Sequence, residues 1–434
     1  VICTFYEYLN FRDVEDASQT CRSWYAAFIN NSKIHNNVEF VIHRKHGQAL
    51  AALSRYPSRC KRITIEDFGF FFTTEIEWEQ VLDCWKLFSD HVNHLRFYKC
   101  KINETQIESF LCSCTSLVSL TVDYCDCADG DTDSLCDLIN LASVTHLEIK
   151  DSRNEYSPYS TDKSLIKLTN FMPKLVHLSL SSKSDHIPFF VGYYIPEYDL
   201  EGRMLPRPEY NLVRRIVEPK FATIVSISVD HNRISRDKLV RLLKVPDLRL
   251  TSLDLYKSGL FNHAVINAIA THQTEIVHLS IINDIFTEPF NLLYRNLEKL
   301  ETFHLWGTLS NSCELESLIY FKELRTLKME GLDFDDYLSN FPQEKPAILK
   351  RLLDKTWDIQ LTHLDLDFDF LENNLPEPAL NIITDCGLVN LAAQPESFKR
   401  SIEELNLRGC YKVTDWGLSK LLPELKRLRV LKLK

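Results

Sequence analysis

"LNLRGCYKVTDWGLSKLL", residues 405–422, contains a strand signal and a helix signal within one short stretch. Leu405 and Leu407 alternate with polar residues, which is typical of a half-buried strand. Cys410 follows the strand closely, and Thr414 with the aspartate after it is a typical helix start. The stretch therefore predicts a strand, a turn at the cysteine and then a helix. Further copies of this unit along the chain would indicate a repeat protein.

The strand half of this unit, apolar-x-x-apolar-x-apolar, recurs along most of the chain. Successive copies start 24 to 32 residues apart, apart from three longer steps of 49, 37 and 41 residues. A base period near 25 indicates a solenoid of stacked repeats. The copies are "CKRITI" (60–65), "VNHLRF" (92–97), "LVSLTV" (117–122), "VTHLEI" (144–149), "LVHLSL" (175–180), "IVSISV" (224–229), "LTSLDL" (250–255), "IVHLSI" (276–281), "LETFHL" (300–305), "LRTLKM" (324–329), "LTHLDL" (361–366), "IEELNL" (402–407) and "LRVLKL" (428–433).

Helical periodicity follows the strand motif in several units. Apolar residues recur at helical spacing within 101–111, 233–243 and 259–270, and Asn103 stands where a helix cap is expected. A strand with one helix cannot bury both apolar faces alone, so neighbouring units must stack. The expected fold is an α/β solenoid with parallel strands on a concave face and helices on a convex face.

The residue three positions after the last apolar strand residue is small and polar, or a cysteine, in six units. We expect this residue to turn the chain and to bond neighbouring backbone amides, forming a ladder between units. "ITDCGLVNLA" at 383–392 repeats the cap, glycine and leucine of the opening stretch. The six residues are Cys100, Cys125, Ser152, Asn232, Ser258 and Cys410.

These features resemble the cysteine-containing class of leucine-rich repeat, most closely at 383–392 and 402–418. The resemblance covers about residues 60–434 and implies a horseshoe of about 12 to 13 units. The 49-residue step places an insertion at 182–223, rich in proline and aromatic residues. We interpret it as an ordered loop folded over the concave face, with a decayed repeat as the alternative.

Residues 1–35 do not fit the repeat and contain three short helical patterns. Their Tyr-Leu pair and the later Cys-Arg-Ser-Trp run resemble the F-box, without the Leu-Pro pair that usually opens that motif. Residues 36–60 are expected to form a connecting strand and helix. A generic helical cap for the solenoid is the alternative interpretation of the N-terminal segment.

The F-box resemblance implies a substrate adaptor of a Skp–cullin–F-box ubiquitin ligase. In that family the F-box docks on the Skp adaptor, and the repeats hold a target protein, so the chain itself needs no catalytic residues. The rival interpretation is a protein-binding scaffold unrelated to ubiquitin. Carried over by position, the F-box residues are Ile2, Phe5, Tyr8, Leu9, Val14, Cys21 and Trp24.

The target surface is expected on the concave wall, where strand residues between the apolar ones point. Tyr256, Ile282 and Trp306 occupy the same position in successive units and predict one exposed apolar stripe. Packing under a loop is the alternative for this stripe. Further along, acidic residues that include Glu330, Asp365 and Asp367 predict either a site for a basic target segment or a solvated face.

Composition limits the partners and the location. The chain of 434 residues is 45% apolar and 25% charged with a net charge of −10, which argues against a nucleic-acid partner. No apolar run approaches the roughly 20 residues that cross a bilayer, so no membrane partner is expected. Thirteen scattered cysteines favour reduced thiols and a cytoplasmic or nuclear location. Because the chain opens on Val1 and stops inside a strand motif, we expect further residues at both ends.

The acidic strand at 365–369 has the spacing of calcium ligands. However, Phe370 stands where a calcium loop requires glycine, and Pro376 where it requires a bidentate glutamate. Alternating strand polarity explains the spacing more simply. We therefore expect no metal, no cofactor and no catalytic residue in this chain.

Cysteine and histidine patterns lead to the same conclusion. The pairs Cys112 with Cys114 and Cys125 with Cys127 have zinc-like spacing, but we interpret them as packed free thiols. Five histidines precede the central apolar strand residue, and we interpret this as a polar column position. They are His94, His146, His177, His278 and His363.

Overall fold

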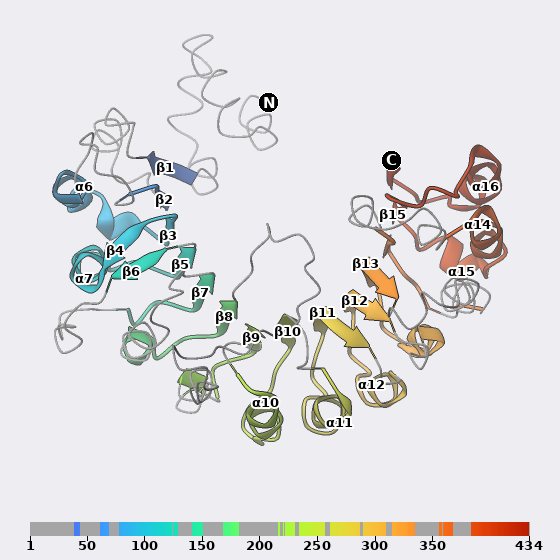
Figure 1. Cartoon of the computed structure of the whole chain (residues 1–434), viewed down its shortest axis with the longest axis horizontal. Coiled ribbons are helices and arrows are strands. Elements are labelled where there is room, and N and C mark those ends of the chain that lie inside the picture. Colours follow the sequence, from blue (N-terminus) through green and yellow to red (C-terminus); the bar gives the residue numbers. More distant parts are fainter. Residues whose placement is uncertain are drawn as a thin grey trace, which may run out of the picture. The chain divides into compact units, whose positions relative to one another are not determined.

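The structure is a computed structural model of the whole chain (Figure 1). It describes residues 39–43, 61–68, 78–123, 125–128, 141–150, 168–181, 216–217, 220, 222–230, 234–256, 261–286, 290–309, 315–334, 356–357, 359–367 and 383–433. The F-box segment, with Ile2, Phe5, Tyr8, Leu9, Val14, Cys21 and Trp24, lies outside these residues, as does most of the insertion at 182–223.

The chain divides into two compact units, which are described separately. The first unit comprises Val1–Leu205 and Arg215–Thr223, and the second comprises Pro206–Arg214 and Ile224–Lys434. Each unit has parallel strands, paired in register with their neighbours.

In the first unit the sheet order is β1-β2-β3-β5-β7-β8. Its strands are β1 (Glu39–His43), β2 (Arg62–Glu66), β3 (His94–Tyr98), β5 (Ser119–Asp123), β7 (His146–Lys150) and β8 (His177–Ser181). Its described helices are α6 (Trp78–Trp85), the short 3-10 helix η2 (Ser89–His91) and α7 (Glu104–Leu111). A small second sheet, β4 (Lys101–Asn103) with β6 (Asp126–Ala128), forms beyond the main strands and was not expected from the sequence.

In the second unit the sheet order is β9-β10-β11-β12-β13-β14-β15-β16. The strands are β9 (Ser226–Asp230), β10 (Ser252–Tyr256), β11 (His278–Phe286), β12 (Thr302–Leu309), β13 (Thr326–Phe334), β14 (His363–Asp365), β15 (Glu404–Asn406) and β16 (Val430–Lys432). The helical elements are α10 (Arg236–Leu243), α11 (His263–His272), α12 (Asn291–Asn296), η4 (Leu315–Tyr320), α14 (Asp385–Ala392), α15 (Glu396–Lys399), α16 (Asp415–Leu421) and η8 (Leu422–Glu424).

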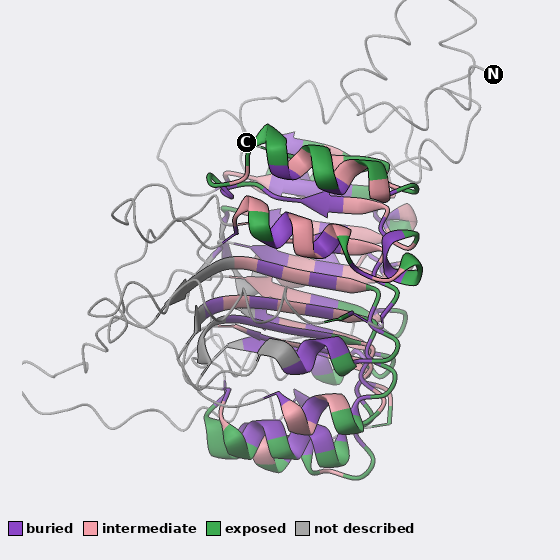
Figure 2. Cartoon of the chain, turned by 90° about the vertical axis from the view of Figure 1, so that its right-hand side faces the viewer, coloured by how far each residue is buried: buried purple, intermediate pink, exposed green. Residues whose placement is uncertain are grey.

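Every strand motif recognised in the sequence carries a strand among these described residues. The helices expected within 101–111, 233–243 and 259–270 are present as α7, α10 and α11. In the second unit α10, α11 and α12 lie on the outer side of the strands (Figure 1), and the helices turn their exposed residues outward (Figure 2). The predicted leucine-rich-repeat solenoid is confirmed for the described part of the chain.

The apolar strand residues form rows that run from repeat to repeat. Register pairs Leu253 with Leu279, Leu279 with Phe303 and Phe303 with Leu327, and each of these side chains is at most 1% exposed. Removing a side chain of this size from water contributes about 1.5–3 kcal/mol. Each side chain is covered by its neighbours above and below, so a repeat gains this free energy only within the stack.

At the predicted ladder position two cysteines bond to the preceding repeat, with carbonyl oxygens as the partners, whereas the Cys125 thiol donates to the carbonyl of Asp123 in its own repeat. The other three predicted ladder residues, Ser152, Asn232 and Ser258, lie outside the described residues. The Cys100 thiol donates to the carbonyl of Ile65, 3.2 Å away, in the preceding repeat. The Cys410 thiol lies 3.5 Å from the carbonyl of Leu366, also one repeat back. Burial raises the pKa of Cys410 to about 12, so this group remains a thiol that can donate.

The aspartate of the Thr-Asp-x-Gly-Leu motif joins two successive repeats. Asp385, in the first turn of α14, accepts hydrogen bonds from the Thr414 backbone N–H at 2.7 Å and from the Thr414 hydroxyl at 2.6 Å. The Thr414 hydroxyl in turn accepts from the Trp416 N–H at 3.2 Å, as a helix cap does. Thr384 occupies the equivalent N-cap position of α14, but its side chain makes no capping hydrogen bond there, so that expected cap is wrong.

The surroundings of Gly417 explain why the Thr-Asp-x-Gly-Leu motif has a glycine at this position. A Cβ atom at this position would overlap the Asp385 carboxylate and approach its Cα to 3.0 Å. Gly417 also contributes a backbone hydrogen bond to Asp385. The glycine therefore admits the aspartate of the preceding repeat to the start of α16.

We predict that Gly417→Ala lowers the free energy of unfolding by about 1–3 kcal/mol, because the new methyl group displaces Asp385. At an unobstructed helix position the same change would stabilise by about 1 kcal/mol through helix propensity. Urea unfolding of the whole chain measures the difference. Lys420→Ala, at an exposed position of the same helix, is the matched control, and a stabilised Gly417→Ala variant would contradict the proposed close approach.

The pKa of Asp385 is lowered by the hydrogen bonds from Thr414 and then from Gly417. A carboxyl whose pKa is lower in the folded state stabilises the fold above its unfolded pKa of about 3.9, and this contribution is lost as the pH falls through the folded value. We therefore predict that Asp385→Asn reduces the urea midpoint at pH 6 and that the difference from the original chain shrinks progressively as the pH falls below about 4. A difference that does not change with pH would show that the charge of Asp385 is irrelevant.

Candidate functional site

The strand residues that point away from the core form a second set of rows, on what we call the open face of the sheet. In the second unit one such row pairs Tyr256 with Ile282, Ile282 with Trp306, and Trp306 with Glu330. We name these four residues the aromatic row. The predicted alignment of Tyr256, Ile282 and Trp306 is present, because the parallel pairing places equivalent residues side by side up to this row, and the register shifts only after Ile282 and after Trp306.

Exposure along the aromatic row differs from the expectation of three exposed groups. Tyr256 and Trp306 are half-buried, whereas Ile282 is only 5% exposed. The shorter side chain of Ile282 lies between two larger rings in register, which limits its contact with water. Tyr256, Trp306 and Glu330 also interact with other groups of the chain. The row therefore offers two half-buried aromatic rings and a carboxylate rather than a fully open apolar stripe.

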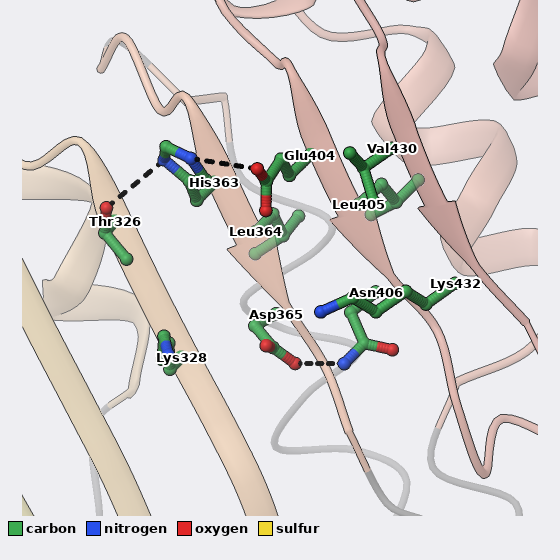
Figure 3. Close-up of a pocket in the computed structure, with 10 residues that line it drawn as sticks. All are labelled: Thr326, Lys328, His363, Leu364, Asp365, Glu404, Leu405, Asn406, Val430 and Lys432. Carbon is green, nitrogen blue, oxygen red and sulfur yellow. Dashed lines mark hydrogen bonds and ion pairs between the residues drawn. The ribbon is translucent and has the colours of Figure 1, made fainter. Parts of the chain in front are cut away.

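A cavity of about 290 Å³ lies over the open face from β13 to β16 (Figure 3). Its lining residues come from two open-face rows and from the backbone between them. They are Thr326, Lys328, His363, Leu364, Asp365, Glu404, Leu405, Asn406, Val430 and Lys432.

Asn406 holds the two aspartates of this region in place. Its side-chain amide donates to Asp365 at 2.7 Å and to Asp367 at 3.2 Å, while its Oδ1 accepts from the Arg408 N–H at 3.1 Å. Asn406 itself is 6% exposed. One buried amide therefore fixes both carboxylates, so their side chains lose little freedom when a ligand binds.

The carboxylates of this region interact electrostatically. The pKa of Asp365 is raised above its usual value, first by burial and then by the negative charge of Glu330, and Asp367 acts in the same direction. Lys328 and the Asn406 hydrogen bond oppose this shift. Because the net shift is upward, burial and like charges prevail over the neighbouring cation at Asp365.

Ion pairs connect the carboxylates to basic side chains on neighbouring strands. Glu330 lies 3.0 Å from His304, and Asp367 lies 3.7 Å from Arg408. In the cavity wall, Glu404 lies 3.6 Å from His363, whose other ring nitrogen is 2.8 Å from the Thr362 hydroxyl. These pairs are partly exposed, so each contributes at most about 1 kcal/mol to stability.

In the first unit, the histidine column predicted from the sequence includes one stacked pair. The rings of His146 and His177 have centroids 4.2 Å apart and are inclined by 23°. Burial and then His94 lower the pKa of His146, while burial and then His146 lower that of His177. Each imidazole thus disfavours a positive charge on the next. Among the described residues, no group of three or more histidine, cysteine or acidic side chains is arranged to hold a metal ion.

The predicted target-binding residues fall into two groups on the open face of the second unit. Tyr256, Ile282, Trp306 and Glu330 share one row, whereas Asp365 and Asp367 lie on the neighbouring strand β14 and just after it. The sequence did not single out Asn406 or Glu404 as site residues, and it indicated only a polar column position for His363. The sequence showed only that these residues occupy polar positions of the strand motif. Because every repeat has such positions, the motif did not distinguish these residues from the others.

Comparisons with known proteins found only distant structural likenesses. No family model matches the sequence, and no curated protein matches it. The solved structures that resemble the chain include the yeast Rad7 and Elc1 complex, with a TM-score of 0.37 and 13% identity over 94% of this chain and 95% of that one. They also include the leucine-rich repeat-containing protein LegL7 from Legionella pneumophila, with a TM-score of 0.35 and 12% identity over 69% and 90% of the two chains.

A third similar structure is internalin C2 from Listeria monocytogenes, with a TM-score of 0.27 and 14% identity over 67% of this chain and 88% of that one. These likenesses carry no argument about function. The repeat architecture is established by the chain's own strand register. Among the described residues no helix has both the length and the apolar character needed to cross a membrane.

We predict that Glu330→Gln lowers the pKa of Asp365 toward its ordinary value, because the substitution removes a neighbouring negative charge. A pH titration followed by NMR, with ¹³C-carboxyl-labelled aspartate, measures this value. Glu323→Gln, which neutralises an exposed carboxylate in the same repeat, serves as the control. An unchanged Asp365 titration in Glu330→Gln would show that the two groups do not interact.

Proposed function

We propose that this chain is the substrate-recognition subunit of a Skp–cullin–F-box ubiquitin ligase. Residues 1–35 would bind the Skp adaptor, and the open face of the second unit would bind the target protein. The bond-making chemistry would belong to other subunits, because an adaptor contributes by raising the effective concentration of its target.

The aromatic row is the observation that carries the target-binding half of the proposal. Tyrosine and tryptophan are enriched among residues that dominate protein interfaces, and here two such rings lie two strands apart on one face. The sheet supports them rigidly, since every strand from β10 to β13 pairs on both sides within the unit. A preformed face of this kind binds with a small loss of conformational entropy.

The resemblance of residues 1–35 to the F-box supports the other half. The Tyr8-Leu9 pair and the run from Cys21 to Trp24 are its most specific matches. An F-box followed by leucine-rich repeats is a known family architecture, and the solenoid that follows here fits it.

The experiment is a binding assay of the full chain with a purified Skp adaptor. We expect Trp24→Ala and Leu9→Asp to reduce Skp binding by more than about tenfold, since each removes or charges an apolar anchor. The double variant Tyr256→Ala with Trp306→Ala should bind Skp as the original chain does. A chain that folds but does not bind Skp would favour the scaffold interpretation, with no link to ubiquitin.

A further inference from the structure

The aromatic row changes character as it crosses the second unit. Tyr256, Ile282 and Trp306 come from β10, β11 and β12, and the next position, on β13, is Glu330. On the next strand, β14, Asp365 pairs with Lys328 and so lies one open-face row away from Glu330, and Asp367 follows it; both aspartates are held by Asn406. The three apolar residues are therefore followed by a carboxylate in the same row, with two further carboxylates on β14 and just after it.

We infer that the open face of the second unit binds an extended segment of its target that carries a large apolar side chain and, about three to four residues away, an arginine or lysine. The apolar side chain would lie on Trp306 and Tyr256. The basic side chain would reach Glu330 and the cavity at Asp365. The inference rests on the proposed use of this face for target binding and specifies the chemistry of the target.

The spacing follows from the geometry of the sheet. Neighbouring strands lie about 4.8 Å apart, and Asp365 is aligned with His304, two residues before Trp306, so Trp306 and Asp365 are separated diagonally by about 12 Å. An extended chain advances about 3.3 Å per residue and covers this distance in about three to four residues. A segment that runs obliquely across the strands can thus place one side chain on Trp306 and another at Asp365.

Charge supports a basic rather than an acidic side chain at this end. Asp365 and Glu404 line the cavity, and Glu330, outside the lining, has a side chain that is 36% exposed and a negative charge that acts on Asp365. Lys328 also lines the cavity, but at Asp365 the influence of Glu330 exceeds that of Lys328. An additional cation would relieve the repulsion between the carboxylates, whereas an anion would increase it.

The cavity is not acidic throughout, and this indicates how the segment enters. Lys328 lines it from β13, and Lys432 lines it from β16, two strands beyond Asp365 (Figure 3). A basic side chain that comes from Trp306 on β12 first meets Glu330, which stands next to Trp306 in the same row. The chain's net charge of −10 makes a basic partner favourable at long range as well.

Selection of a random linear peptide library on the immobilised full chain tests the inference. We expect enrichment of peptides with a large apolar residue and an arginine or lysine about three to four positions away. A synthetic peptide of the enriched type should bind the double variant Glu330→Gln with Asp365→Asn at least about tenfold more weakly than the original chain. Glu323→Gln, at an exposed position of the same repeat, should bind it unchanged.

Two outcomes overturn the inference. The first is a selection that enriches no basic residue at this spacing or that yields no binding peptide at all. The second is a double variant that binds the enriched peptide as tightly as the original chain does. Circular dichroism verifies that the double variant is folded. If the selected peptides are apolar and lack a basic residue, and if Trp306→Ala abolishes their binding, the inference about the basic side chain is wrong. The proposal that this face binds the target would still stand. The Skp assay tests the F-box half separately.

Discussion

Stacking of repeats is the constraint on which this structure depends. A strand of five residues exposes two apolar side chains on its inner side, and one helix cannot cover them together with its own apolar face. The rows through Leu253, Leu279, Phe303 and Leu327 show the solution, since each side chain is covered by those of the repeats before and after it. The same requirement fixes the register, because a shift of one residue would turn every leucine toward the open face.

Polar contacts between repeats serve this stacking. The Cys100 and Cys410 thiols bond to carbonyls one repeat back, and Asp385 bonds to Thr414 one repeat forward. Gln273 has a related role: it is 1% exposed, donates to the carbonyls of Leu243 and Leu248, and accepts from the Leu250 N–H. Buried backbone groups in the connections require such partners, because an unsatisfied group costs about 1–3 kcal/mol.

Register also creates the candidate binding face. Because equivalent residues of successive repeats stand side by side, a substitution in any repeat adds one side chain to a continuous surface. Tyr256, Ile282 and Trp306 form such a surface, and Glu330 ends it. The core rows constrain residue type strongly, whereas the open-face rows are free to vary, so recognition can change without loss of the fold.

The sequence alone determined the repeat, the strands and several helices, since the alternation of leucines and the helical periodicity are local and recur along the chain. It also indicated which open-face residues share a row, because the parallel strand motifs pair without a shift up to this row. Burial and mutual electrostatics were decided by the tertiary structure. Ile282 is covered by its surroundings, Asn406 joins two aspartates from another repeat, and Gly417 makes room for Asp385. Each of these depends on distances between residues far apart in the chain, which periodicity does not specify.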